Sequence, residues 1–197
     1  MKKKNLIIFG AGGHAISCID IILSLGNFNI KFLIEKNIKK KELFGIKILK
    51  EKKNLGSYKK NANYAFIGVG QIKSFLPRKK LFDRLRSEKF KLPTIISKKA
   101  YVSRKSEIGI GTVIMHGAIV NAGVKIGDNC IINTGAIVDH GSKIGNNSHI
   151  STGVLINGDC IVADNSFIGS GSILREKSFI KKNSFIKMGS IISNKTK

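Results

Sequence analysis

The second half of the chain places an aliphatic residue at every sixth position. The series begins at Ile96 and continues through Ile186 without interruption. Four residues after each member stands a compact residue, from Ala100 to Ser190, which is Ala, Ser, Thr, Cys or, twice, Val. A helix repeats about every 3.6 residues and a strand every two. A period of six is instead typical of a parallel β-helix, in which each hexad forms one flat side and a short turn.

The hexads predict a triangular solenoid. Three hexads close a coil of about 18 residues, and neighbouring coils stack about 4.8 Å apart, the usual spacing between strands. The aliphatic residues fill the narrow interior and the compact residues fit its crowded corners. Turn sequences such as Gly127-Asp128-Asn129 tolerate positive φ angles. Cys130 and Cys160 fall on corner positions, which predicts small core residues rather than catalytic groups.

The first half predicts a small α/β domain. Apolar runs of strand length alternate with segments of helical periodicity, in the order of a short nucleotide-binding βαβ unit. The expected strands are Asn5–Phe9, Ile30–Ile34 and Tyr64–Val69, and the expected helices are Ile16–Leu25 and Pro77–Lys89. We therefore expect a Rossmann-like domain over residues 1–95 and a parallel β-helix over residues 96–197.

A glycine-rich turn, Gly10-Ala11-Gly12-Gly13-His14-Ala15, follows the first expected strand. Backbone N–H groups in such a turn, together with the N-terminus of the next helix, hold phosphate groups. A glycine turn also serves simple tight packing. Two interpretations therefore stay open at this point, a site for a phosphate or nucleotide-sugar and a structural turn.

The chain is strongly basic. Its 197 residues include 35 Lys and Arg against 12 Asp and Glu, a formal net charge of +23. This excess suggests an anionic partner, either nucleic acid or phosphorylated small molecules, although abundant Lys, Asn and Ile also fit an AT-rich genome. The charge is uneven, with +16 in residues 1–95 and −2 in residues 108–174. Because there is no continuous basic stripe and no aromatic interleaving, we expect no nucleic-acid partner.

The apolar runs also bear on location. None reaches the about 18 residues that a membrane span needs, so we expect no membrane association. The start, MKKKNLIIFG, imitates a signal peptide, but the apolar stretch ends at the glycine-rich turn and no convincing cleavage site follows. The interpretation is a buried first strand in a cytoplasmic protein. Three cysteines are too few and too scattered for a disulfide framework.

Four histidines are candidates for proton transfer. His14 lies in the glycine-rich turn, His116 and His140 occupy the same hexad slot, and His149 directly precedes an aliphatic position. The last three slots point outward, where a histidine often has no role. His140 stands out because Asp139 precedes it and His149 follows half a coil later. A neutral imidazole is a natural general base for an amine or hydroxyl nucleophile.

A metal site is the competing use of these histidines. Ligands within one chain would have to stack one coil, or 18 residues, apart. The residues one coil away from His140 and His149 are Ala122, Gly158, Ile131 and Phe167. None of these is a metal ligand, so we expect no metal site within the chain, which leaves only a site shared between subunits.

Together, these motifs resemble one family. A GAGGHA turn after an N-terminal strand, a short α/β domain, and hexapeptide repeats carrying I-x-N-T-x(5)-H and S-H-x-S are similar to the sialic acid O-acetyltransferase (NeuD) family of sugar acyltransferases. That family includes PglD-type UDP-4-amino-sugar N-acetyltransferases and perosamine N-acetyltransferases. The resemblance covers nearly the whole chain. It implies a left-handed β-helix, a homotrimer with active sites between subunits, a nucleotide-sugar on the N-terminal domain and acetyl-CoA along the β-helix.

The resemblance also implies roles for residues. By motif position, His140 matches the general base and Asn133 could orient substrate. His149 matches a position at the acetyl-CoA thioester, and Gly169 and Ser170 match the coil along which the pantetheine runs. The residues that match the sugar-nucleotide pocket are Gly12, Gly13, His14, Glu35 and Gly70. The motifs identify no donor for the tetrahedral oxyanion.

The chain departs from the family pattern beside the proposed base. The residue after the histidine is commonly acidic and tunes its basicity, but here it is Gly141. Asp159 lies 18 residues after Gly141 and is expected to stack over that slot. Asp139 is expected to point to another side. We expect Asp159 or Asp139 to supply the charge.

Two further departures concern the substrates. The second strand ends with Glu35 alone, where the family usually has two acidic residues that read the nucleotide. The C-terminal G-x-P-A segment that lines the CoA pocket is missing. Contacts to the CoA phosphates are expected instead from Lys181, Lys182 and Lys187.

The sequence therefore predicts an acetyl-CoA-dependent N-acetyltransferase that acts on a UDP- or GDP-linked 4-amino-deoxysugar for surface glycan synthesis. O-acetylation of sialic acid or a related sugar is the alternative within the fold. The missing acid after His140 favours an amine, because a hydroxyl needs stronger help from a base. A non-catalytic β-helix binding protein is the alternative of another class, and the in-register His14, Asn133, His140 and His149 argue against it.

Overall fold

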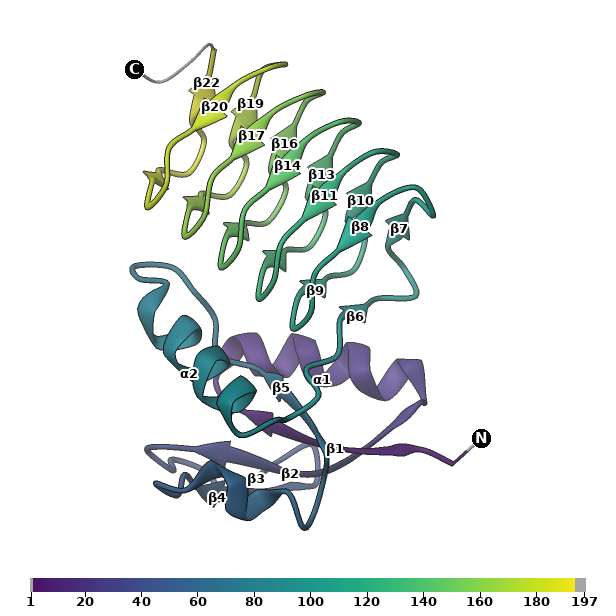
Figure 1. Ribbon diagram of the computed structural model, residues 1–197, viewed down its shortest axis with the longest axis vertical. Helices are drawn as coiled ribbons and strands as arrows, with labels where there is room; N and C mark the ends of the chain where they lie inside the picture. Colours follow the sequence, from purple (N-terminus) through teal and green to yellow (C-terminus); the bar gives the residue numbers. More distant parts are fainter. Residues whose placement is uncertain (1, 194–197) are drawn as a thin grey trace. The chain divides into compact units, whose positions relative to one another are not determined.

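The computed structural model describes residues 2–193, which divide into two compact units (Figure 1). The α/β unit consists of residues 2–70 and 76–93, and the β-helix unit consists of residues 71–75 and 94–193. The short segment Gln71–Phe75 thus interrupts the α/β unit in the sequence but packs with the β-helix.

A five-stranded sheet with the order β3-β4-β2-β1-β5 forms the centre of the α/β unit. Its strands are β1 (Lys4–Phe9), β2 (Phe28–Glu35), β3 (Glu42–Leu43), β4 (Ile46–Lys50) and β5 (Tyr64–Ile67). All are parallel to their neighbours except β3, which pairs antiparallel with β4. The helices are α1 (Gly13–Leu25), the 3₁₀ helix η1 (Leu55–Tyr58) and α2 (Leu76–Ser87). The expected α/β architecture is confirmed.

The sheet is apolar on both faces, as is usual for parallel strands. Ile7 and Phe9 of β1 pack in one cluster with Leu85 of α2. Ile8 points to the opposite face, because a side chain at Gly68 would touch both Ile8 and Ala15 of α1. The continuous apolar run of β1 therefore serves two layers of helix.

The sequence analysis missed β3, β4 and η1. The two strands form a hairpin whose turn, Phe44-Gly45, has positive φ at both residues. Lysines interrupt the apolar residues around this hairpin, so its pattern resembles a loop. The helix α1 begins at Gly13, three residues before the expected start, because Gly12 already has the extended conformation of an N-cap.

The β-helix unit contains seventeen described strands of two residues each, β6–β22. Face 1 consists of β6 (Ile95–Ile96), β9 (Val113–Ile114), β12 (Ile131–Ile132), β15 (His149–Ile150), β18 (Phe167–Ile168) and β21 (Phe185–Ile186). Face 2 consists of β7 (Tyr101–Val102), β10 (Ile119–Val120), β13 (Ile137–Val138), β16 (Leu155–Ile156), β19 (Ile173–Leu174) and β22 (Ile191–Ile192). Face 3 consists of β8 (Glu107–Ile108), β11 (Lys125–Ile126), β14 (Lys143–Ile144), β17 (Ile161–Val162) and β20 (Phe179–Ile180).

The coils follow the predicted period. Partners across neighbouring coils are 18 residues apart, as in Ile119 opposite Ile137 and Ile131 opposite His149. The aliphatic positions from Ile114 to Ile180 form one core cluster, and none is more than 4% exposed. A buried serine is tolerated at a corner because its hydroxyl donates to a carbonyl of the next coil, as Ser142 Oγ does to Asn157 O at 2.9 Å. The predicted parallel β-helix is confirmed.

A ladder of asparagines follows the corner between face 3 and face 1. Asn129, Asn147, Asn165 and Asn183 all have φ between 54° and 63°. Each amide Nδ2 donates to the Oδ1 one coil further along, at 2.9, 3.3 and 2.9 Å. Asparagine tolerates this left-handed conformation better than most residues, and the ladder satisfies its side chain.

We expect Asn165→Ala to lower the free energy of unfolding by about 1–3 kcal/mol, because it breaks two ladder bonds and places a Cβ residue at positive φ. Asn165→Gly keeps the conformation and should cost less. Equilibrium denaturation of both variants separates the two contributions. Equal losses would contradict the role of the positive φ.

Candidate active site

The glycine-rich turn leaves β1 through a backbone that only glycine fits. Gly10 has φ of 109°, and a Cβ there would lie 2.9 Å from the carbonyl carbon of Gly68. Gly12 and Gly13 are exposed, and a Cβ at either position would meet nothing within 4 Å. The N-terminus of α1 is therefore open to a ligand, and its free N–H groups favour an anion.

Glu35 closes one side of this turn. Its Oε2 accepts the Ala11 N–H at 2.9 Å and its Oε1 accepts the Lys36 N–H at 2.8 Å. A hollow of about 420 Å³ lies beside it, lined by Gly12 and Gly13 together with Asn37, Lys39, Lys40 and other residues of the same unit. The end of β2 thus holds the turn in shape at the edge of a hollow that contains two amines.

His14 and Gly70 are neighbours in the same unit. A Cβ at Gly70 would lie 3.2 Å from the His14 Cβ. The His14 Nε2 lies 3.4 Å from the Cys18 Sγ, one turn along α1. The segment that carries Gly70 is held by the fully buried Arg78, which donates to Ile67 O at 2.7 Å and Val69 O at 2.8 Å. Four of the five residues expected at the sugar-nucleotide pocket, Gly12, Gly13, Glu35 and Ala11's neighbour His14, thus lie along one turn and the strand end beside it.

The three buried cysteines are unreactive by their surroundings. Burial raises the pKa of Cys18 to about 12 and raises that of Cys160. Because the thiolate is the reactive form, we expect no fast labelling by a disulfide reagent of the native protein near pH 8 and full labelling after denaturation. Rapid labelling of a native thiol would contradict this burial. The result also matters practically, since a thiol-release assay needs a silent background.

His140 lies in the corner between face 2 and face 3, and its partner is Asp139. The His140 Nδ1 lies 3.1 Å from Asp139 Oδ1. The same oxygen accepts the His140 backbone N–H and the Asn121 Nδ2–H, both at 2.8 Å. The expectation that Asp139 points to another side is therefore wrong, because three donors at the corner turn its carboxylate back toward the ring.

These contacts fix the charge of Asp139. The backbone N–H of His140, followed by the Asn121 amide and the His140 ring, lowers the pKa of Asp139 below its usual 3.8. The carboxylate is therefore anionic at neutral pH and accepts the Nδ1 proton. The His140 side chain is 66% exposed, and its Nε2 has no partner among the described residues. An imidazole in this arrangement presents a free lone pair to solvent.

Asp159 and Gly158 lie one coil above. A Cβ at Gly141 would fall 2.1 Å from Asp159 Oδ1, so this carboxylate stands over the slot where the resemblance expects an acid. A Cβ at Gly158 would fall 2.6 Å from the His140 Nε2 and 2.7 Å from its Cε1. The imidazole therefore rests on Gly158, which the sequence analysis noted only as a position without a metal ligand. The signal was its spacing of one coil from His140.

Asn133 and His149 form a second cluster. The Asn133 Nδ2 donates to the His149 Nε2 at 3.1 Å, and the Asn133 Oδ1 accepts the Thr134 N–H at 2.8 Å. The His149 Nδ1 bonds the carbonyl oxygen of Gln71. His149 is only 5% exposed and its ring meets Phe167 edge-on, with centroids 5.2 Å apart. The sequence predicted an outward slot for His149 but gave no sign that residues 71–75 would cover it.

The two clusters stand at opposite ends of β13. Asn133 lies in the corner that precedes this strand, and His140 lies in the corner that follows it. Gly169 and Ser170 continue the corner of Asn133 two coils further on, where Ser170 Oγ lies 2.9 Å from Ser151 Oγ. One chain therefore brings Asn133, His149, Gly169 and Ser170 to one edge of face 2, and His140, Asp139 and Asp159 to the other.

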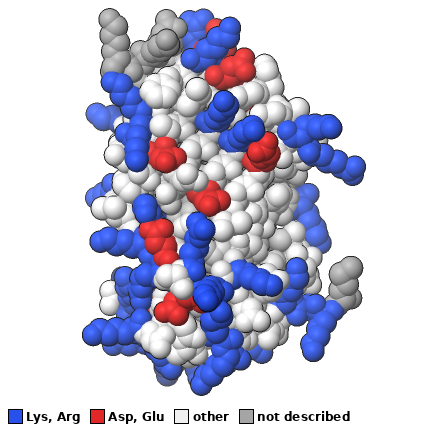
Figure 2. Space-filling model, in the orientation of Figure 1, with Lys and Arg blue, Asp and Glu red and all other residues white. Residues whose placement is uncertain are grey.

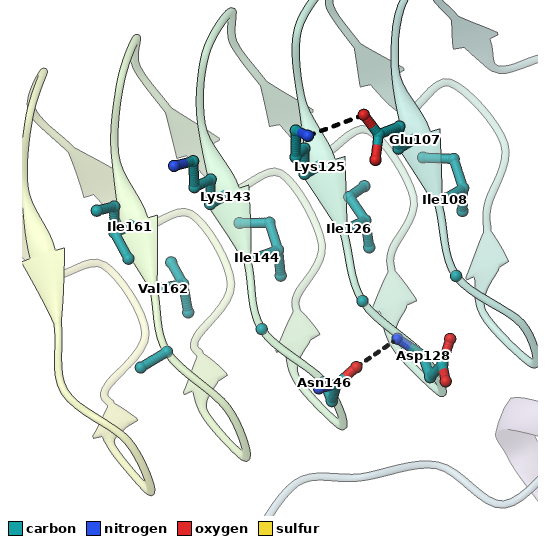
Figure 3. Close-up of a pocket in the computed structure, with 14 residues that line it drawn as sticks. Glu107, Ile108, Lys125, Ile126, Asp128, Lys143, Ile144, Asn146, Ile161 and Val162 are labelled. Carbon is teal, nitrogen blue, oxygen red and sulfur yellow. Dashed lines mark hydrogen bonds and ion pairs between the residues drawn. The ribbon is translucent and has the colours of Figure 1, made fainter.

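Face 3 carries a shallow hollow of about 530 Å³, shown in Figure 3. It is lined by outward residues such as Lys125 and Lys143, and Lys125 forms an ion pair of 2.9 Å with Glu107. None of the expected site residues lines it. Figure 2 shows the basic side chains on one side of the molecule separated by uncharged areas.

Two absences hold for the part of the chain that the structure describes. No three His, Cys, Asp or Glu residues there lie close enough together to bind a metal ion. No helix within residues 2–193 combines the length and the apolar character of a membrane span.

Comparisons with known proteins agree with this architecture. Residues 5–85 match the model of the PglD N-terminal domain, and residues 141–176 match that of the bacterial transferase hexapeptide, with six repeats. None of the curated proteins matches the chain. Several solved structures do, over nearly its whole length.

Three of these structures are similar throughout. A perosamine N-acetyltransferase from Caulobacter crescentus, solved as a histidine-to-asparagine mutant with CoA and GDP-perosamine, has a TM-score of 0.91 at 25% identity, over 97% of this chain and 89% of that one. The acetyltransferase domain of PglB from Neisseria gonorrhoeae has a TM-score of 0.87 at 25% identity, over 98% and 93%. WeeI from Acinetobacter baumannii shares the fold, with a TM-score of 0.86 at 20% identity over 98% and 93%.

The fold and these matches define a class. The chain is an acyltransferase of the hexapeptide-repeat type, with a left-handed β-helix. Within that class it is PglD-like, because residues 5–85 form a PglD N-terminal domain ahead of the repeats.

Proposed function

We propose that the protein transfers the acetyl group of acetyl-CoA to the amino group of a nucleotide-linked 4-amino-deoxysugar. The observation that carries the proposal is the His140 imidazole, whose Nδ1 is held by anionic Asp139 and whose Nε2 is free. A ring held in this tautomer is ready to accept a proton. The Caulobacter and Neisseria structures hold CoA with GDP-perosamine and acetyl-CoA, respectively, which supports the same donor and a similar acceptor here.

The chemistry follows from this tautomer. The sugar amine attacks the thioester carbonyl, and its proton passes to His140 Nε2 as the N–C bond forms. Collapse of the tetrahedral intermediate breaks the C–S bond, and the proton leaves with the sulfur of CoA. Asp139 stabilises the imidazolium between these steps. Asp159, stacked over Gly141, adds a second carboxylate near the ring.

The oxyanion of the intermediate needs a donor. The Gly158 N–H has no acceptor among the described residues, and Gly158 lies directly against the His140 ring. We assign this N–H to the oxyanion, an interaction typically worth about 3 kcal/mol in related chemistry.

The acceptor and donor sites follow the open surfaces of each unit. In the α/β unit, the exposed N-terminus of α1 and the lysines of the adjacent hollow suit the diphosphate of a UDP- or GDP-sugar. In the β-helix unit, the corner of Gly169 and Ser170 suits the pantetheine. Both substrates are made in the cytoplasm, so we assign the protein there, in the synthesis of a surface glycan.

The active form that we propose is a homotrimer. Face 2 presents an apolar residue at every outward position: Tyr101, Ile119, Ile137, Leu155, Ile173 and Ile191. Face 3 presents Glu107, Lys125 and Lys143 at the equivalent positions instead. An exposed apolar column of this kind favours burial against other copies. Three-fold packing along face 2 would also bring the Asn133 edge of one copy to the His140 edge of the next, which one chain keeps apart.

We expect Leu155→Lys to dissociate the trimer, because it places a charge within the apolar column. Leu155 is 37% exposed. Ile161→Lys is the matched control, since Ile161 is 40% exposed at the same slot on face 3. Sedimentation velocity should give a trimer for the wild type and Ile161→Lys, and smaller species for Leu155→Lys. Trimers from all three proteins would contradict the role of face 2.

An acetyl-CoA turnover assay that follows thiol release tests the proposed reaction. The acceptors are UDP-, GDP- and dTDP-linked 4-amino sugars, free sialic acid and CMP-sialic acid, and His140→Ala is the control. Turnover on an amino sugar that depends on His140 supports the proposal. Turnover on sialic acid alone would replace it with O-acetylation, and no turnover on any acceptor would favour a binding protein.

A further inference from the structure

The polar contacts around His149 leave only one arrangement of hydrogens. The Gln71 carbonyl can only accept, so His149 Nδ1 carries the ring proton. The Thr134 N–H can only donate, so Asn133 Oδ1 faces it and Asn133 Nδ2 faces the ring. His149 Nε2 must therefore accept from Asn133 Nδ2, at 3.1 Å. The direction of every bond follows from the two backbone groups at its ends.

We infer that His149 is a positioning residue that fixes the side-chain amide of Asn133, and that Asn133 offers substrate an N–H donor rather than its carbonyl. One Nδ2–H is given to His149, and the other has no acceptor among the described residues. Asn133 is half-buried, so this N–H faces accessible space. The atom that it meets must be an acceptor, such as a carbonyl oxygen. This role differs from direct contact between His149 and the acyl thioester.

Burial makes this arrangement stable. His149 is 5% exposed and Gln71 is 3% exposed. The Gln71 side chain also donates to Asn147 O at 2.8 Å, which holds the segment that supplies the terminal carbonyl. Phe167 packs on the ring from the next coil. A buried ring with its polar partners satisfied resists reorientation, since each lost bond would leave a buried group unpaired.

The catalytic consequence rests on the proposed function, but the hydrogen-bond arrangement does not. A long-range ¹H–¹⁵N correlation spectrum of the full-length protein at neutral pH reports the tautomer of each histidine. We expect the Nδ1–H form for His149, identified by its loss in His149→Phe. The Nε2–H form, or an averaged signal, would overturn the inference whether or not the protein is a transferase.

Kinetics test the consequence for catalysis. His149→Phe keeps an aromatic ring against Phe167 but removes both hydrogen bonds, and His149→Gln retains one donor and one acceptor. We expect His149→Phe to lower kcat by about 10-fold and to change KM for acetyl-CoA by less than about 2-fold, with His149→Gln recovering most of the loss. Recovery by Gln separates lost hydrogen bonds from lost packing, and it keeps the test valid if the Phe variant folds poorly.

A double-mutant cycle decides whether His149 acts through Asn133. In the Asn133→Ala protein, His149→Phe should lower kcat by no more than about 2-fold further, because no amide remains to be positioned. A loss as large as in the wild type, or a rise in KM for acetyl-CoA that persists without Asn133, would overturn the inference in favour of direct contact. If the tautomer is Nδ1–H but no acceptor is acetylated, the positioning stands and the proposed reaction fails.

Discussion

Replacing His140 by alanine is expected to lower kcat for acetyl transfer by about 10²–10⁴-fold, the usual contribution of a general base. The side chain is exposed and contributes no packing to the β-helix core, so the fold should be unchanged. His116→Ala is the matched control. His116 occupies the same hexad slot, with its Nδ1 2.6 Å from Ser97 Oγ and no carboxylate partner at that nitrogen.

The measurement is steady-state kinetics with the acceptor identified by the turnover panel, together with thermal unfolding of each variant. A kcat for His140→Ala within about 10-fold of the wild type would remove His140 from the role of base. A large loss in His116→Ala would show that the slot matters for structure rather than for proton transfer.

The pH dependence should identify the titrating group. The pKa of Asp139 is lowered, so its favourable interactions are present above its unfolded pKa and are lost only as pH falls through the depressed folded value, below 3.8. Loss of activity between about pH 5 and 8 would therefore report the imidazole and not Asp139. Asp139→Asn together with Asp159→Asn should change the pH profile of kcat/KM. An unchanged profile would show that neither carboxylate acts on the base.

Gly158→Ala is expected to lower kcat by about 10²-fold, because a displacement of about 1 Å of a catalytic group has costs of this size. The new Cβ would overlap His140 Nε2 and Cε1, at 2.6 and 2.7 Å. Gly158 does not have a positive φ, so alanine brings no backbone strain. All other atoms lie at least 3.3 Å from the added carbon, which makes the imidazole the group that must move.

The double variant separates this effect from general damage. In the His140→Ala protein, the added Cβ at Gly158 has no ring to displace, so Gly158→Ala should cause no further loss of kcat. Unfolding midpoints should remain close to that of the parent in both backgrounds. A further large loss in the double variant would indicate that Gly158 acts independently of His140, for example through its N–H alone.

The β-helix could be predicted almost completely from the sequence. Each coil is narrow, so the volume of every inward side chain is restricted, and the restriction repeats every six residues from Ile96 onward. The first strand and the glycine-rich turn were also predictable, because an unbroken apolar run followed by glycines has few other structures. The β3–β4 hairpin was not, because its short strands carry lysines and little apolar alternation.

The candidate site divides along the same line. The sequence by itself determined which chemical groups recur along the coil, since the hexad register assigns His140, Asn133 and His149 to outward slots. Only the tertiary structure decided their partners. Asp139 turns toward His140 because three donors meet its oxygen, and Gln71 reaches His149 across 78 residues of chain. Register is set by local volume and period, whereas the direction of a polar side chain depends on donors and acceptors that folding brings from elsewhere.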